Sequence, residues 1–151
     1  MRATRVFALL AIGAGVAPAC KDTTAIPSSV EIYTATLNGS NERPTPVTTT
    51  ATGAATFTVL GNLVSWKVDI TSAIDSVIIG HIHDGAADVA GGVIVSLSPT
   101  PTGVGFTGTV TLGSASPVDS VLTLMRAGNT YVNIHTKKNP GGEIRGQLVK
   151  Q

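Results

Sequence analysis

The chain has little of what most catalytic and nucleic-acid-binding proteins use. Its 151 residues include one cysteine, three histidines, one tryptophan, two tyrosines and three phenylalanines. Ten Lys and Arg stand against nine Asp and Glu, so the formal net charge is only +1. One cysteine cannot form an internal disulfide, and a near-neutral chain without a basic patch is not expected to bind nucleic acid. The few aromatic residues also leave little surface for stacking bases or sugars.

Motifs of common enzymes are missing as well. The sequence has no Gly-x-Ser-x-Gly, and Gly91-Gly92 is not followed by the strand-turn-helix of a phosphate-binding loop. The carboxylates are few and scattered, with no convincing acid/base pair. We therefore expect a protein without catalytic residues.

The N-terminus has the pattern of an export signal. Arg2 and Arg5 precede an uncharged apolar stretch at residues 6–16, and small residues lead up to Cys20. An apolar stretch of this length is too short to span a bilayer, which takes about 20 residues. We predict a signal peptide at residues 1–19, with a buried N-terminal helix as the alternative.

Cys20 resembles the cysteine of a bacterial lipoprotein box, which becomes the lipid-bearing first residue of the exported protein. Ala17 replaces the usual leucine and Pro18 is unusual in such a box, so ordinary signal cleavage is the alternative. Acyl chains on Cys20 would hold the protein on a membrane without a spanning helix. The polar residues 20–29 would then form a flexible linker.

This arrangement predicts a lipid-anchored protein of the cell envelope that faces the periplasm or the cell exterior. Its expected partner is the membrane, and a protein or glycan partner is left open. Lys21 separates Cys20 from Asp22, which favours sorting to an outer membrane where there is one.

Residues 30–151 have the pattern of a single β domain. Val64, Trp66, Val68 and Ile70 alternate with polar residues, which predicts a strand with one buried face. Expected strands cover residues 31–37, 51–60, 63–71, 76–83, 93–97, 104–112, 130–136 and 143–149. Their number and the frequent Gly/Pro turns predict an all-β fold, an antiparallel β-sandwich or Greek-key barrel of about seven or eight strands.

Two local signals refine this expectation. Gly61-Asn62 lies between two β-rich runs and predicts a two-residue hairpin. One short helix is expected before the penultimate strand, with Ser116 as its cap, Pro117 in its first turn and Gly128 at its end.

All three histidines lie in strand-like contexts that are followed by Gly-rich turns. His81 and His83 are two apart, so both point to one face, and His135 lies on another expected strand. Three neutral imidazoles can bind copper or zinc. In that interpretation Glu42, Asp84, Asp88 and Glu143 are candidates to orient the rings.

A structural role is the alternative. His81 and His83 would then bond the loops that follow them, and His135 would bond Glu143. Convergence of three ring nitrogens on one point would favour the metal site, and an outward-pointing His135 would disfavour it.

Glu143 and Arg145 are two apart on an expected strand and therefore share a face. We expect ion pairs with Arg43 and Glu42, which would fix the turn at residues 38–44 against the last strand. A polar ligand cleft near the histidines is the alternative.

Several of these segments together resemble the CHRD family, a module named from chordin and common in bacterial exported proteins. The resemblance rests on Tyr33–Gly39 with Asn41, Glu42 and Pro44, on Thr52-Gly53 and Ala55–Phe57, on Gly80–His83 with Gly85 and Gly91–Val93, and on Tyr131–Thr136 with Pro140–Leu148. It implies a β-sandwich domain outside the cytoplasm and no particular reaction. The ligand-binding role of chordin does not follow, since a fold does not carry a function with it.

Three functions remain open from the sequence. The first is a non-catalytic binding or structural module held by a lipid. The second is a mononuclear copper- or zinc-binding protein using His81, His83 and His135. The third is a small metalloenzyme with an open coordination position at the same site.

Overall fold

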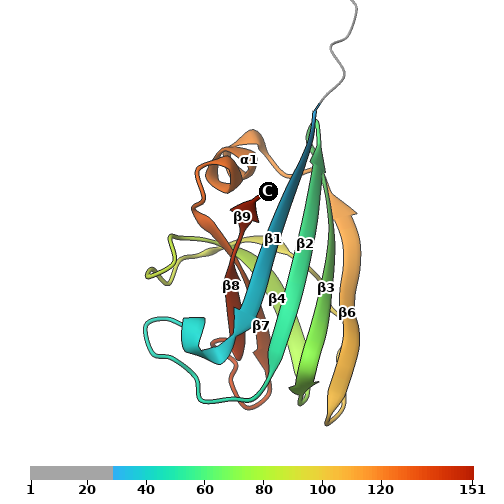
Figure 1. Cartoon of the computed structure of the whole chain (residues 1–151), viewed down its shortest axis with the longest axis vertical. Coiled ribbons are helices and arrows are strands. Elements are labelled where there is room, and N and C mark those ends of the chain that lie inside the picture. The colour runs from blue at the N-terminus through green and yellow to red at the C-terminus, as the bar shows by residue number, and fades with distance from the viewer. Residues whose placement is uncertain (1–28) are drawn as a thin grey trace, which may run out of the picture.

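The computed structural model describes residues 29–151, so the predicted signal peptide, Cys20 and most of the linker lie outside it. Figure 1 shows strands that curl around one core, with a single α-helix at one end. The elements are β1 Val30–Asn38, the 3-10 helix η1 Gly39–Asn41, β2 Thr52–Leu60, β3 Leu63–Ile74, β4 Val77–Asp84, β5 Val93–Ser96, β6 Phe106–Ala115, α1 Asp119–Arg126, β7 Thr130–Thr136, β8 Ile144–Gln147 and β9 Val149–Lys150.

The strands form one antiparallel sheet in the order β5-β4-β7-β8-β1-β2-β3-β6, and β9 adds to β1. The expected all-β antiparallel fold is therefore confirmed. Residues 97–103 connect the two ends of the sheet: the Leu97 amide donates to the Gly80 carbonyl on β4, and the Thr100 amide donates to the Val110 carbonyl on β6. Pro99 and Pro101 lack amide protons, which explains why this segment forms no regular strand.

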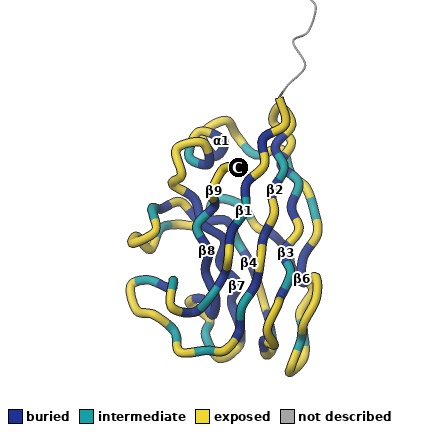
Figure 2. Tube along the Cα trace, in the orientation of Figure 1, coloured by how far each residue is buried: buried dark blue, intermediate teal, exposed yellow. Residues whose placement is uncertain are grey.

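The core lies inside the curl and is built by the period-two pattern. Buried and exposed residues alternate along β1, β2 and most of β3, as Figure 2 shows. Phe57 and Trp66 are paired across β2 and β3, with ring centroids 6.4 Å apart. The Gly61-Asn62 hairpin is confirmed: Leu60 pairs with Leu63, and Gly61 has a φ of 63°, which favours glycine.

A buried carboxylate holds the helix and the last strand to β1. Glu31 accepts hydrogen bonds from Arg126 of α1, at 2.7 and 3.0 Å, and from Lys150 of β9, at 2.7 Å. Tyr33 donates a fourth bond to the same carboxylate. These donors, the Arg126 bond above all, lower the pKa of Glu31 to about 2. Local sequence does not reveal this network, because Arg126 and Lys150 are far from Glu31 in the chain.

The helix begins later than predicted. Its first residue is Asp119, its cap is Val118, and no side chain bonds the cap position, so Ser116 is not the cap. Val118 is extended, with φ −65° and ψ 153°, so the first helical residue is Asp119. The predicted end is correct: Gly128 has a φ of 73°, and its amide and that of Asn129 bond the last turn.

Two other boundaries differ from the prediction. The sixth strand covers Phe106–Ala115 instead of residues 104–112, because Gly105 turns at a φ of 70° and β3 continues to pair up to Ala115. The expected strand 143–149 is two strands. β8 pairs with β7, and after buried Leu148 the chain moves to β1 as β9.

Candidate metal centre

The three histidines meet on the outer face of adjacent strands. His81 and His83 lie on β4, and β7 pairs with it so that His81 is opposite Asn133 and His135 is one step further along the same face. One ring nitrogen of each histidine lies within 4.8 Å of the others. His83 and His135 are buried, whereas His81 is half-buried. The side chain of His135 therefore points toward the other two.

The hydrogen bonds of the rings fix which nitrogens are free. His83 Nδ1 lies 3.0 Å from the Gly91 carbonyl, and His135 Nδ1 lies 3.0 Å from the Pro140 carbonyl. A carbonyl only accepts, so both Nδ1 atoms donate and both Nε2 atoms keep their lone pairs. His83 Nε2 is buried without a hydrogen-bond partner. His135 Nε2 lies 3.2 Å from His81 Nδ1, which donates to it.

This arrangement fits a transition-metal ion. Metal-binding histidines usually donate the other ring N–H to a carbonyl or carboxylate, which holds the ring in place. Ligand nitrogens at about 2.0–2.1 Å from a tetrahedral zinc are roughly 3.3 Å apart. His81 and His135 already have this spacing, at 3.2 Å, and the wider separations in the cluster, within 4.8 Å, would close as the rings move toward the ion. His81 can supply Nδ1 by moving its proton to Nε2, since the residue is half-buried rather than enclosed.

The electrostatics keep the rings neutral, which is the form that binds metal. Burial lowers the pKa of all three histidines, and it brings that of His135 to about 4. The hydrogen bond that His135 donates to the Pro140 carbonyl opposes this lowering of the pKa but does not cancel it. At neutral pH no proton therefore competes for the ligand nitrogens.

The carboxylates predicted to orient the rings do not do so. The imidazoles of His83 and His135 are held by main-chain carbonyls, and Asp84 and Asp88 are exposed. Of the hydrogen bonds expected for a structural role, the structure contains the one from His83 to the loop after it. The expected partners differ for the other two, because His135 bonds Pro140 instead of Glu143 and His81 bonds His135.

A planar stack supports the cluster from one side. The His83 ring lies on the Tyr131 ring with centroids 4.9 Å apart and planes 13° apart. The Arg145 guanidinium lies 3.4 Å from the Tyr131 ring centre and donates to the Ala86 carbonyl at 2.8 Å. Arg145 thereby ties loop 85–92, which carries Gly91, to the sheet. In the sequence Tyr131 belongs only to the family motif. Its contact with His83 follows from the pairing of β4 with β7, which sets the two residues opposite each other.

The expected ion pairs of Glu143 and Arg145 with Arg43 and Glu42 are absent. Among residues 29–151 the salt bridges join Lys67 to Asp69 and both Arg126 and Lys150 to Glu31. Glu143 precedes β8 instead of sharing a strand face with Arg145. The turn is nevertheless fixed to the sheet, since Asn41 donates to the Arg145 carbonyl.

Glu42 is a buried acid next to the cluster. Asn133, on the same face as the histidines, donates to its Oε2 at 3.2 Å, while its Oε1 is buried without a partner. Burial raises the pKa of Glu42 from 4.5 to about 7, against the opposing effects of Asn133 and the charge of Arg145. The positive charge of Arg145 therefore favours the ionised form of Glu42, although the two side chains form no direct ion pair.

This shift predicts a pH-dependent stability. The folded protein holds the Glu42 proton more tightly than the unfolded chain does. The stabilisation of the fold by this proton is therefore complete below pH 4.5 and is lost as pH rises to about 7. The loss is on the order of 3 kcal/mol. Urea unfolding of the wild type and of Glu42→Gln at pH 5 and pH 8 measures it. The wild type should lose stability relative to the variant between these pH values, and parallel curves would contradict the shift.

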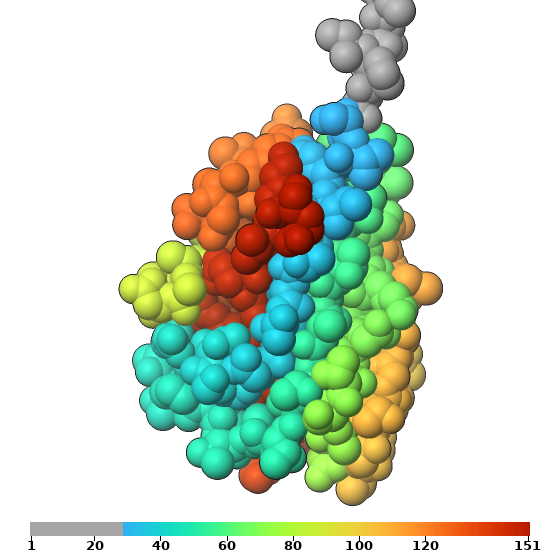
Figure 3. Space-filling model, in the orientation of Figure 1, coloured from blue at the N-terminus to red at the C-terminus, as the bar shows by residue number. Residues whose placement is uncertain are grey.

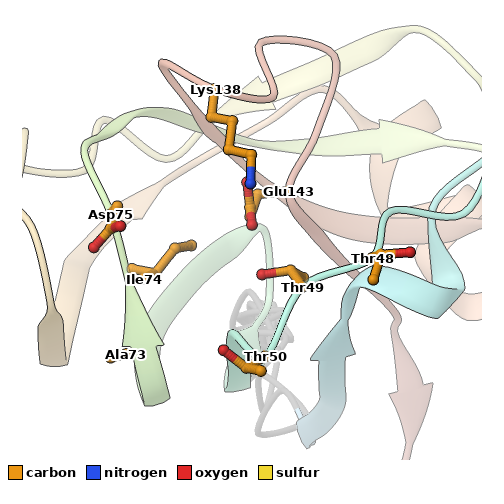
Figure 4. Close-up of a pocket in the computed structure, with 8 residues that line it drawn as sticks. All are labelled: Thr48, Thr49, Thr50, Ala73, Ile74, Asp75, Lys138 and Glu143. Carbon is orange, nitrogen blue, oxygen red and sulfur yellow. The ribbon is translucent and has the colours of Figure 1, made fainter.

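Glu143 lines a different pocket, of about 380 Å³, at the end of the sheet (Figure 4). Thr48, Thr49, Thr50, Asp75 and Lys138 line the same space. Burial alone would raise the pKa of Glu143, but bonds from Asn139, Thr49 and Thr136 lower it. The Glu143 carboxylate therefore accepts hydrogen bonds from the segments around it and does not orient the imidazoles.

The fold and the site define a class: a curled antiparallel β domain with a histidine cluster on the outer face of two strands. Residues 33–148 match the family model described as CHRD domain. The chain therefore belongs to the CHRD family, as the sequence motifs predicted, and this membership indicates a non-catalytic extracellular module. No curated protein and no solved structure matches the chain significantly. No helix in residues 29–151 has the length and hydropathy of a membrane span.

Proposed function

We propose that this protein is a non-catalytic module of the cell envelope that binds one copper or zinc ion through His81, His83 and His135. One observation carries the proposal: three ring nitrogens lie within 4.8 Å of one another. The buried, unpartnered Nε2 of His83 strengthens it. A buried nitrogen lone pair without a partner is costly, and a metal ion would satisfy it.

The two carbonyl bonds support binding over a merely structural role. A structural histidine needs one good hydrogen bond. Here His83 and His135 are each held through Nδ1, which leaves the Nε2 of His83 without a partner and directs the Nε2 lone pair of His135 toward His81. The neutral state adds to this, because the low pKa of His135 removes proton competition. Three protein ligands leave a fourth position for water, on the side of half-buried His81.

The lipid anchor is the second part of the proposal. It is supported by the sequence around Cys20, by a lone cysteine that needs an explanation, and by the short polar stretch before the domain. The anchor would hold the domain on the periplasmic or outer surface of a membrane. A mass measurement on the Cys20 peptide of the exported protein tests it.

Metal titration tests the binding. We expect one equivalent of Cu²⁺ or Zn²⁺ per chain, measured by calorimetry and by metal analysis after dialysis. His81→Ala, His83→Ala and His135→Ala should each lose at least about a hundredfold in affinity, because each removes a direct ligand. Ser96→Ala is the matched control, since Ser96 is exposed and pairs with His81 on β5. Equal affinity in the wild type and all three histidine variants would contradict the site.

A further inference from the structure

An exposed apolar patch lies at the end of the domain where the chain enters it. Five side chains form it: Val30 and Ile32 of β1, Leu60 of β2, Leu63 of β3 and Val149 of β9, each between 42% and 58% exposed. Aliphatic side chains exposed side by side at one place, rather than singly, are unusual on a soluble monomer and indicate a contact surface.

The strand register places these side chains together. Val30 pairs with Leu60 and Leu60 pairs with Leu63, and directly paired residues point to the same side of a sheet. Ile32 is two residues from Val30 and shares its face, while Val149 is paired with neighbouring Thr34. In the space-filling view the blue start of β1 and the red C-terminal residues lie against each other at this end (Figure 3).

From this patch we infer that the domain rests on the lipid bilayer through these five residues. The inference depends on the lipid anchor of the proposed function. Nine residues lie between Cys20 and Val30, and even a fully extended chain over these ten steps spans no more than about 36 Å. An anchored Cys20 therefore keeps the patch close to the membrane, where a weak contact acts at a high effective concentration.

The charges near the patch permit this contact. Glu31 lies between Val30 and Ile32 in sequence, but its side chain points to the other face and is bonded to Arg126 and Lys150. The patch itself contains no charged side chain that would have to be dehydrated on contact with lipid. The two cations are about half exposed at the same end of the domain, where they can meet lipid phosphates.

A second copy of the chain fits the patch less well. A specific protein interface usually buries about 800 Å² on each partner with 20–30 residues a side, and five partly exposed side chains are too few for that. A bilayer requires no matching surface, and each methylene group buried in it adds to the attraction.

Fluorescence quenching tests the inference. The chain from Cys20 onward, which contains the whole described domain, is coupled through Cys20 to a maleimide lipid in phosphatidylcholine–phosphatidylglycerol vesicles that carry nitroxide-labelled lipids. Leu60→Trp puts a probe in the patch. Leu112→Trp is the matched control, because Leu112 is also exposed and lies on β6, opposite Lys67 and outside the patch. Trp66 is buried and gives the same background in both variants.

We expect nitroxide lipids to quench the Leu60→Trp signal at least about threefold more than the Leu112→Trp signal. Equal quenching of the two variants would overturn the inference, as would a dimer in solution that Leu63→Ser dissociates. Chemical coupling makes this result independent of acylation in the cell. An unmodified Cys20 peptide from the exported protein would therefore contradict the anchor without changing the outcome for the patch.

Discussion

Gly91→Ala should weaken metal binding about 10- to 100-fold without removing any metal ligand, which is the usual effect of losing a group that orients a ligand. The Gly91 carbonyl accepts the bond from His83 Nδ1, and the Gly91 amide donates to the Tyr131 hydroxyl oxygen. A Cβ atom on Gly91 would overlap the main-chain carbonyl of Asp84. Loop 85–92 would have to move, and His83 would lose the partner that fixes its ring and its proton.

Gly92→Ala is the matched control for this substitution. Gly92 is the next residue, it is exposed, and a Cβ there would meet no atom within 4 Å. We expect it to bind metal as the wild type does. Competition with a chromophoric chelator measures both affinities. Wild-type affinity in Gly91→Ala would show that the carbonyl does not orient His83, and a similar loss in both variants would point to the loop in general.

Arg145→Ala should reduce the free energy of unfolding by about 3 kcal/mol, because it removes a large, well-packed side chain and leaves a cavity. Arg145 is 1% exposed and is the largest of the fully buried side chains. Its guanidinium covers the Tyr131 ring at 3.4 Å and holds the Ala86 carbonyl. The substitution should also weaken metal binding, since it frees the loop that carries Gly91.

Arg145→Lys separates charge from shape. Lysine keeps the positive charge but lacks the flat guanidinium, so we expect it to recover less than half of the lost stability. Arg43→Ala is the control, because Arg43 is only partly buried and bonds main-chain carbonyls of its own turn. Its effect should stay below about 1 kcal/mol. Full recovery by lysine in urea unfolding would show that the stacking on Tyr131 contributes little.

The β-rich part of the fold could be predicted from local pattern. Alternation along residues 63–71 and the glycine at position 61 determine a strand and a hairpin by themselves, and both are present. The helix start could not be predicted as well, because Ser116 and Pro117 favour a start at residue 117, whereas Val118 is extended in the structure and the helix begins at Asp119. The link between β4 and β6 through residues 97–103 depends on contacts between distant segments, which local sequence does not reveal.

The candidate site could likewise be predicted only in part from local sequence. The spacing of His81 and His83 predicted a shared face, and the structure brings His135 to them through the pairing of β4 with β7. The atoms that orient the rings belong to the main chain of Gly91 and Pro140. A sequence shows side chains, so it suggested carboxylates where the loops in fact supply carbonyls.

The most direct test of the metal centre is X-ray absorption at the metal edge on protein loaded with one equivalent of Zn²⁺, and separately with Cu²⁺. The three imidazoles of His81, His83 and His135 predict three nitrogen ligands at about 2.0–2.1 Å, with the multiple-scattering signature of histidine rings and one further light-atom ligand. His135→Ala should reduce the imidazole count or bind no metal. A shell of oxygen ligands alone, unchanged in His135→Ala, would contradict the metal centre proposed for this protein.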